Sequence, residues 1–291
     1  MAKKVTGKKG CKIELSREIS AELEKTLDDL TLFDDDLMGK VFDGNTEATE
    51  LLLQIILERK DFRIIRVKGQ VEFRSPYAKG RTIRLDILAT GEDGTEFNVE
   101  VQRNTKGSHI RRARYHQSMI DARLLKRNQD FQELKDTYVI FICQHDKFKQ
   151  NKPVYHVDKT IRETGKNFDD GAHVIYVNGG YRGDDDFGKL AHDFNCKNPE
   201  LIYYKPLADG VRHIKGTEKG RGNMCEAFER LAEKVADERA EQVTKQVTRQ
   251  MTNKYLEAIM KSGKISLAEA LDMFDITGKD REMYEKQFAE Y

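Results

Sequence analysis

Two acidic residues in neighbouring stretches of alternating polarity have the types and spacing that metal chemistry needs. Asp86 belongs to the stretch 82–89 and Glu100 to the stretch 96–102. Apolar and polar residues alternate in both stretches, and a Glu-Asp-Gly turn sequence lies between them, which predicts a β-hairpin. Two carboxylates on adjacent strands form a hard oxygen site that suits Mg²⁺ or Mn²⁺. The competing interpretation is an ordinary strand surface whose charged residues face water.

Asp86 is the more informative of the two acids because its neighbours are apolar. A carboxylate in such surroundings should not be buried without a partner. The predicted alternation places Asp86 on the strand face opposite Ile83, Leu85, Ile87 and Ala89. On the second strand, Glu100 and Gln102 are two positions apart and therefore share a face. We expect all three polar side chains to meet on the polar side of the hairpin.

A basic segment follows the hairpin in a chain whose net charge is only +1. Between residues 103 and 114 there is no acid, and the basic residues are Arg103, Lys106, Arg111, Arg112 and Arg114. A basic patch inside a neutral protein is typical of a site for a polyanion such as nucleic acid. A solvated helix face is the alternative.

The basic segment runs into a predicted helix over residues 108–126, with Ser108 as its cap. Its inward stripe is Ile110, Ala113, Ile120 and Leu124, and Gln117 falls within that stripe. An inward glutamine needs a hydrogen-bonding partner. Because arginines lie beside it, we expect the helix to bring amide and basic groups to the acids, where a phosphate would be bound.

The remaining pattern predicts an α/β domain at residues 25–215, after an N-terminal tail and the start of a first helix at 1–24. Helices are expected at 13–30, at 35–42, from an Asn45 or Thr46 cap to residue 58, and at 184–194. Strands are expected at 62–73, 138–143 and 173–177, and the nearly all-apolar 138–143 should be buried on both faces.

A glycine-rich linker is expected at 210–222, before an all-helical region at 216–291. That region should contain a long helix at 224–261 and short helices at 266–274 and 279–291. Val235, Val243, Val247 and Met251 form a thin apolar stripe that is too narrow to fold alone. We expect it to pack on the core or on a second chain in a homodimer, or to belong to a helix-turn-helix that reads DNA.

Other function classes are disfavoured by composition. The four cysteines form no CxxC pair, and the histidines show no zinc-binding spacing. The basic start lacks the apolar stretch of a signal peptide, and no apolar run approaches the roughly 18 residues that span a bilayer. We expect a cytoplasmic protein with reduced thiols, no membrane segment and no small-molecule cofactor.

The residues from "RLDILATGEDGTEFNVEVQRN" to "SHIRRARYHQSMIDARLL", followed by "LKDTYVIFIC", resemble the PD-(D/E)XK nuclease family transposases. These are also called Rpn, or recombination-promoting nuclease-like, proteins. The segment "LTLFDDDLMGKVFDGNTEATELLLQIIL" is similar to the N-terminal region of that family. The resemblance covers about residues 25–200 and implies a restriction-endonuclease-like core, a mixed sheet flanked by helices in the order αβββαβ.

The resemblance also implies roles for individual residues. Asp86, Glu100 and the backbone carbonyl of Val101 would hold one Mg²⁺ (or Mn²⁺). Gln102 stands where many related enzymes have Lys, which removes a cation that Arg112 or Arg114 would then supply. Glu47 matches an acid often found on the first core helix, and Glu50, one turn later, is the competing assignment.

These expectations describe a metal-dependent DNA endonuclease with little sequence specificity, linked to recombination or mobile elements. Its contacts to the DNA backbone would come from Arg103, Arg111, Arg112, Arg114 and Gln117. The rival is a catalytically idle nuclease fold that binds DNA or a protein partner. The presence of Gln102 in place of Lys favours the rival, and the retention of both acids argues against it.

Overall fold

The computed structural model describes residues 26–75, 79–104, 107–261 and 265–288. The predicted tail at 1–24 and most of the helix predicted at 13–30 lie outside these ranges. The chain divides into two compact units, Met1–Glu226 and Ala227–Tyr291.

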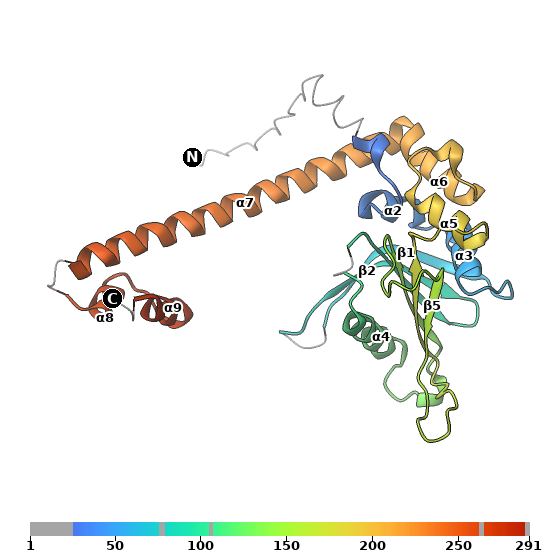
Figure 1. Ribbon diagram of the computed structural model, residues 1–291, viewed down its shortest axis with the longest axis horizontal. Coiled ribbons are helices and arrows are strands. Elements are labelled where there is room, and N and C mark those ends of the chain that lie inside the picture. The colour runs from blue at the N-terminus through green and yellow to red at the C-terminus, as the bar shows by residue number, and fades with distance from the viewer. Residues whose placement is uncertain (1–25, 76–78, 105–106, 262–264, 289–291) are drawn as a thin grey trace, which may run out of the picture. The chain divides into compact units, whose positions relative to one another are not determined.

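The first unit is built around one six-stranded mixed sheet (Figure 1). The strands lie in the order β1-β2-β3-β4-β6-β5. The first three are antiparallel neighbours, β3, β4 and β6 are parallel, and β5 is antiparallel to β6. Their bounds are β1 Ile64–Phe73, β2 Ile83–Gly91, β3 Glu96–Gln102, β4 Thr137–Cys143, β5 Val154–Val157 and β6 Ala172–Asn178.

Helices cover both faces of this sheet, with α4 on one side and the other helices of the unit opposite it (Figure 1). Their bounds are α2 Asp35–Phe42, α3 Thr46–Ile56, α4 Ile110–Leu124, α5 Asp186–Asn195 and α6 Lys205–Gly216. Short 3₁₀ helices occupy Phe131–Glu133 and Pro199–Leu201. The predicted fold class and the order αβββαβ are both confirmed.

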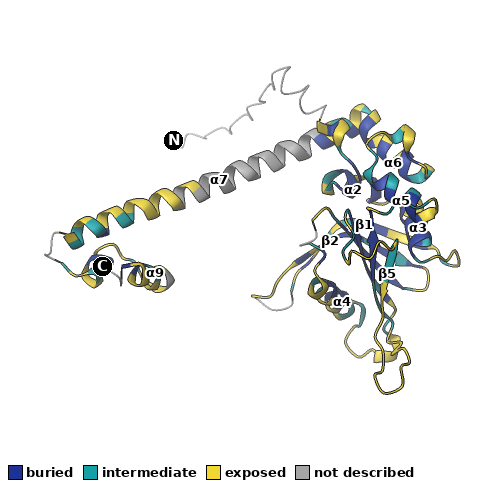
Figure 2. Cartoon of the chain, viewed as in Figure 1, coloured by how far each residue is buried: buried dark blue, intermediate teal, exposed yellow. Residues whose placement is uncertain are grey.

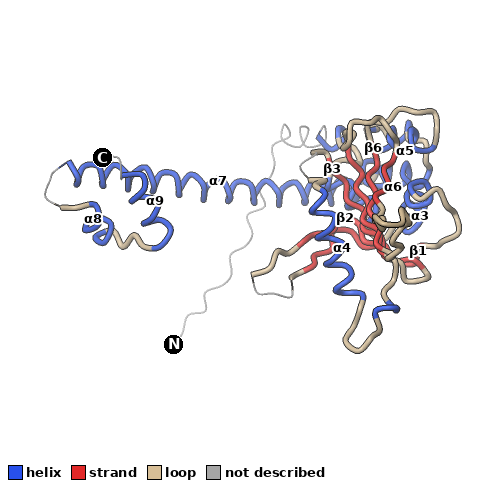
Figure 3. Tube along the Cα trace, turned by 60° about the horizontal axis from the view of Figure 1, so that its bottom comes forward, coloured by secondary structure: helices blue, strands red, loops and turns tan. Residues whose placement is uncertain are grey.

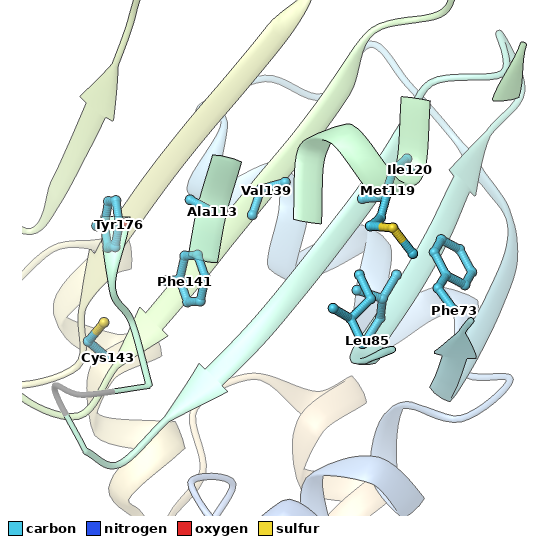
Figure 4. Packing of buried hydrophobic residues seen from close by; sticks show 10 residues of the cluster. Phe73, Leu85, Ala113, Met119, Ile120, Val139, Phe141, Cys143 and Tyr176 are labelled. Atoms are coloured by element: carbon cyan, nitrogen blue, oxygen red, sulfur yellow. The ribbon is translucent and has the colours of Figure 1, made fainter. Parts of the chain in front are cut away.

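The core lies on both sides of β4, whose residues are nearly all buried. Figure 2 shows that the sheet as a whole is largely buried between the helices. Val139, Phe141 and Cys143 pack into a cluster with Ala113 and Ile120 of α4 (Figure 4). Successive strand residues point to opposite faces, so the intervening buried isoleucines of β4 face the other helices. The sequence predicted a strand buried on both faces, and this prediction is confirmed.

Two details of α4 differ from prediction. His109, not Ser108, is the N-cap, and its Nδ1 accepts a hydrogen bond from the backbone N–H of Arg111 at 3.1 Å. Ile110 is 59% exposed, so it does not belong to the inward stripe. The helix α4 starts one residue later than the Ser108 cap implied, and its inward face begins at Ala113.

The predicted glycine-rich linker is helical instead. Residues 210–216 belong to α6, and α7 begins at Glu218. A Cβ on Gly210 would lie 2.8 Å from Cγ1 of Val41, and one on Gly220 would lie 2.5 Å from the carbonyl oxygen of His213. These glycines permit close packing rather than flexibility, and the first unit therefore continues to Glu226.

The second unit consists of the C-terminal part of α7 (Glu218–Lys261) with α8 (Leu267–Met273) and α9 (Gly278–Phe288) (Figure 3). It has a small core of its own, made by Leu256, Ala270, Leu271, Tyr284 and Phe288. Within the described residues, no helix combines the length and apolar character needed to cross a membrane.

Candidate active site

The hairpin brings the two acids together in the interior. Asp86 on β2 is 8% exposed and Glu100 on β3 is fully buried. The backbone N–H of Asp86 donates to Oε1 of Glu100 at 3.3 Å. In return, the N–H of Val101 donates to Oδ2 of Asp86 at 3.0 Å. Each carboxylate is therefore held by the backbone of the strand that carries the other.

An irregularity in β2 lies at Asp86. Leu85 and Leu88 both pack against the cluster under α4 although they are three positions apart. A regular strand would place them on opposite faces, so the predicted alternation breaks at Asp86 and Ile87. On the neighbouring strand β1, Gln70 lies opposite Asp86, between the pairs Gly69–Ile87 and Val71–Leu85. Its φ of 51° is a left-handed conformation. Irregularities of this kind change the direction in which nearby groups point. Here they coincide with the hydrogen bond from the backbone N–H of Asp86 to Glu100.

Burial and mutual repulsion make the pair attractive to a cation. Burial, and after it the negative charge of Glu100, raise the pKa of Asp86 from 3.8 to about 7. The Val101 N–H and the Arg112 guanidinium act in the opposite direction on this pKa. A divalent cation between the carboxylates would remove the repulsion, and a site of one or two carboxylates completed by water and phosphate is usual for Mg²⁺. The donor set therefore fits the metal that the sequence implied.

Arg112 of α4 is the basic residue that reaches the acids. Its Nη2 donates to Oε2 of Glu100 at 2.6 Å. Its Nη1 donates to the carbonyl oxygen of Gly107 at 3.0 Å and approaches Oε1 of Gln102 at 3.5 Å. Of the two arginines proposed to replace the missing lysine charge, the structure places Arg112 at the site, whereas Arg114 is exposed on the same helix.

His116 is a site residue that the sequence reading missed. It is 1% exposed, and its Nδ1 lies 3.4 Å from Oε1 of Glu100 and 3.1 Å from the amide nitrogen of Asn98. Its Nε2 accepts from Nε of Arg112 at 3.2 Å. Because a guanidinium can only donate, a neutral ring carries its proton on Nδ1, facing Glu100. The amide of Asn98 then presents its Oδ1, which otherwise has no partner, to this N–H. The spacing of Ala113, His116 and Gln117 on one helix face could have revealed it.

Asp35 is the second residue that was missed. Its carboxyl is at the start of α2 and reaches solvent, yet partial burial raises its pKa, and the charge of Glu100 contributes to the rise. Asp35 in turn contributes to the raised pKa of Asp86. The run of three aspartates at residues 34–36 was a signal in the sequence, but which of them faces the hairpin depends on how α2 packs.

The structure does not bring Glu47 to the acids. It lines a surface hollow of α3 together with Glu50, Arg63 and Pro206. Glu50 is engaged there, because it accepts from Nη1 of Arg63 at 2.8 Å and from the N–H of Ile64 at 3.0 Å. The helix acid whose charge interacts with both members of the pair is Asp35, from the helix before the one that the resemblance implied.

Gln117 and Arg103 are also engaged elsewhere. The side-chain amide of Gln117 is buried and bonds to the hydroxyl and the carbonyl oxygen of Thr137. Thr137 pairs with Glu96 at the far end of β3, away from Glu100. Nη2 of Arg103 donates to Oδ2 of Asp34 at 2.7 Å, which ties the end of β3 to α2. Arg111 is exposed on α4, and Lys106 lies outside the described residues.

Comparison with known proteins agrees with this geometry. Residues 37–178 match a sequence model of the PD-(D/E)XK nuclease family transposases. No curated protein and no solved structure matches the chain. The matched segment contains β1 to β6, α3 and α4, and therefore both acids, while Asp35 lies just before it.

The mixed six-stranded sheet with flanking helices is consistent with a PD-(D/E)XK nuclease-like fold. The match indicates a nuclease, for which DNA is the implied substrate, and nucleases of this type generally use divalent metals.

Proposed function

We propose that this protein is a divalent-metal-dependent endonuclease that hydrolyses phosphodiester bonds in DNA. The observation that carries the proposal is the buried pair of Asp86 and Glu100, one of which has its pKa raised to about 7. Keeping two carboxylates together in an apolar interior is costly unless a cation is bound there for part of the working cycle. A strongly raised pKa at such a pair is typical of a functional site.

Each residue of the site has a role in this proposal. Asp86, Glu100 and the carbonyl of Val101 would hold Mg²⁺ or Mn²⁺. The bound ion would supply Lewis acidity and neutralise charge on the scissile phosphate. Gln102 would orient the phosphate or the attacking water, and Asp35 would accept a hydrogen bond from that water.

DNA would be held mainly through its backbone. Arg111 and Arg114 are exposed on α4, on the helix whose Arg112 reaches Glu100. Contacts of this kind carry little sequence information and weaken with salt. Gln117 has no part in this proposal because Thr137 engages its amide. A link to recombination or mobile elements rests on the family description alone.

The rival function is a catalytically idle module that binds DNA or a protein partner. The observation that favours it is that Arg112 pairs with Glu100 and so neutralises its charge. Titration with Mn²⁺ separates the two functions, because the idle module has no need to bind the ion at Asp86.

Incubation with supercoiled plasmid tests the proposed activity. We expect nicked or linear product with Mg²⁺ and none in EDTA, and a loss of about two to four orders of magnitude for Asp86→Ala or Glu100→Ala. Glu92→Ala, which changes an exposed acid in the turn of the same hairpin, is the matched control and should cut normally. Full cleavage in EDTA, or normal cleavage by Asp86→Ala, would rule out the proposal.

A further inference from the structure

Protein donors already satisfy the Glu100 carboxylate. Oε1 accepts from the N–H of Asp86 at 3.3 Å and lies 3.4 Å from Nδ1 of His116. Oε2 accepts from Nη2 of Arg112 at 2.6 Å. The side chain of Glu100 is fully buried, so these groups take the place of water. A carboxylate has about four lone-pair positions, so a divalent cation at Glu100 would have to approach the carboxylate close to the Arg112 guanidinium.

The three donors differ in how easily they can leave. The Asp86 N–H is part of β2 and cannot move alone. The His116 side chain is 2% exposed and its ring lies against Phe141, with centroids 6.3 Å apart. The Arg112 side chain is 34% exposed, and its guanidinium is at the end of a long flexible stem. Arg112 is thus the donor that can withdraw most easily, and its withdrawal also breaks its bonds to Nε2 of His116 and to the carbonyl oxygen of Gly107.

The charges of His116 and Arg112 also make Arg112 the easier of the two to displace from Glu100. His116 is neutral when Nε2 accepts from Arg112, so it can stay beside a metal-holding carboxylate and orient it, as outer partners of metal ligands do. The Arg112 guanidinium is permanently positive. A second positive ion at the same carboxylate repels it, and its fork of donors matches phosphate as well as carboxylate.

We propose that Arg112 is an exchangeable counter-ion of Glu100, which a divalent cation displaces from the carboxylate and which then binds a phosphate of the DNA. This inference rests on the proposed nuclease function and adds to it a coupling between metal binding and phosphate binding. Metal binding frees the arginine that contacts the substrate, and by linkage phosphate binding favours the metal-bound site. While Arg112 is in place, its Nε also fixes the tautomer of His116 that faces Glu100.

Isothermal titration of the full chain with Mn²⁺, without DNA, tests the exchange directly. Removing a competing charge-assisted hydrogen bond, for which about 1.5–3 kcal/mol is typical, should tighten Mn²⁺ binding roughly tenfold to a hundredfold in Arg112→Gln. Arg114→Gln removes the same charge from the exposed face of α4 and should change the affinity by no more than about twofold. Arg112→Lys keeps a cation on a point-charge head and should fall between wild type and Arg112→Gln.

The outcomes separate the two proposals. Unchanged or weaker Mn²⁺ binding by a folded Arg112→Gln, with tight binding by wild type that Asp86→Ala abolishes, would overturn the exchange and leave the nuclease function intact. No Mn²⁺ binding by wild type would overturn both. If Arg112→Gln does not fold, Arg112→Lys decides, because affinity equal to wild type there contradicts the exchange and tighter binding supports it.

Discussion

At the scale of single residues, the raised pKa of Asp86 has a consequence for stability. The pKa of its carboxyl is about 7 in the folded protein and 3.8 ordinarily. The folded state therefore favours the protonated acid, and the stability it contributes is complete below about pH 4 and is lost as pH rises through 7. Since one pKa unit corresponds to about 1.4 kcal/mol, the loss is at most about 4 kcal/mol.

Asp86→Asn should remove this loss, because an amide keeps the acceptor for the Val101 N–H but carries no charge. In EDTA we expect the variant to be more stable than wild type by about 1–3 kcal/mol at pH 8 and nearly equal to it at pH 4.5. Urea unfolding at both pH values measures the difference. A variant less stable than wild type at pH 8 would mean that the charged form of Asp86 is not strained in the metal-free protein.

Asp35 and Glu47 can be distinguished by paired substitutions that keep size and remove charge. Because Asp35 interacts electrostatically with both acids of the pair, Asp35→Asn should lower plasmid cleavage by at least about tenfold. Glu47→Gln, in the hollow on α3, should change it by less than about twofold. Asp36→Asn is the control for the loss of charge from α2. The reverse pattern, with loss only in Glu47→Gln, would restore the assignment implied by the sequence resemblance.

At the scale of elements, the sequence predicted most of the frame. The predicted bounds of α2 and β3 agree with the structure residue for residue, and the hairpin, β4, β6 and the three C-terminal helices were all expected. These elements are specified by local signals, namely alternation, capping residues and all-apolar runs. The acids of the hairpin could be found for the same reason, because strand pairing alone brings them together.

The parts that were missed depend on packing between distant segments. The break in alternation at Asp86 lies opposite Gln70 on another strand. His116 was hidden because its partner Glu100 belongs to a different element. Asp35 could not be chosen over Glu47 because both begin helices, and only tertiary packing decides which helix start approaches the hairpin.

The glycines of the supposed linker provide a prediction at this scale. If Gly210 serves close packing of α6 on α2, Gly210→Ala should destabilise the protein by about 1–3 kcal/mol, because its Cβ meets the stiff side chain of Val41 at 2.8 Å. Gly222 is the matched control within α7, since a Cβ there meets nothing within 4 Å. Gly222→Ala should instead stabilise the helix, by up to about 1 kcal/mol. Equal effects of the two substitutions in thermal unfolding would argue for the flexible linker.

At the scale of the whole molecule, α7 exposes an apolar row that its own unit leaves uncovered. Val243, Val247, Met251 and Tyr255 are four positions apart and are 58%, 47%, 56% and 56% exposed. Rows of residues four apart form the ridges by which helices pack together. An exposed apolar row of this kind is typical of an interaction surface.

The charges along α7 favour a second copy of this chain as the partner. Residues 226–241 contain six acids and three bases, whereas residues 245–261 contain four bases and one acid. Two copies crossing antiparallel near residue 243, with the row of each helix on residues 232–244 of the other, would place the acidic half of each helix near the basic half of the other. A parallel pair would bring like charges together. We therefore propose an antiparallel homodimer, in which a two-fold axis presents two nuclease sites.

Sedimentation analysis of the full chain tests this assembly. We expect wild type to be a dimer at micromolar concentration and Val247→Asp to raise the dissociation constant at least about tenfold, because a charge in the apolar row must be desolvated. Thr248→Asp adds the same charge at the next exposed position, outside the row, and should leave the dimer intact. If the dimer also presents two sites to both strands, Val247→Asp should convert linear plasmid product mainly to nicked circles. A monomeric wild type, or equal effects of the two substitutions, would show that this row is not the dimer contact.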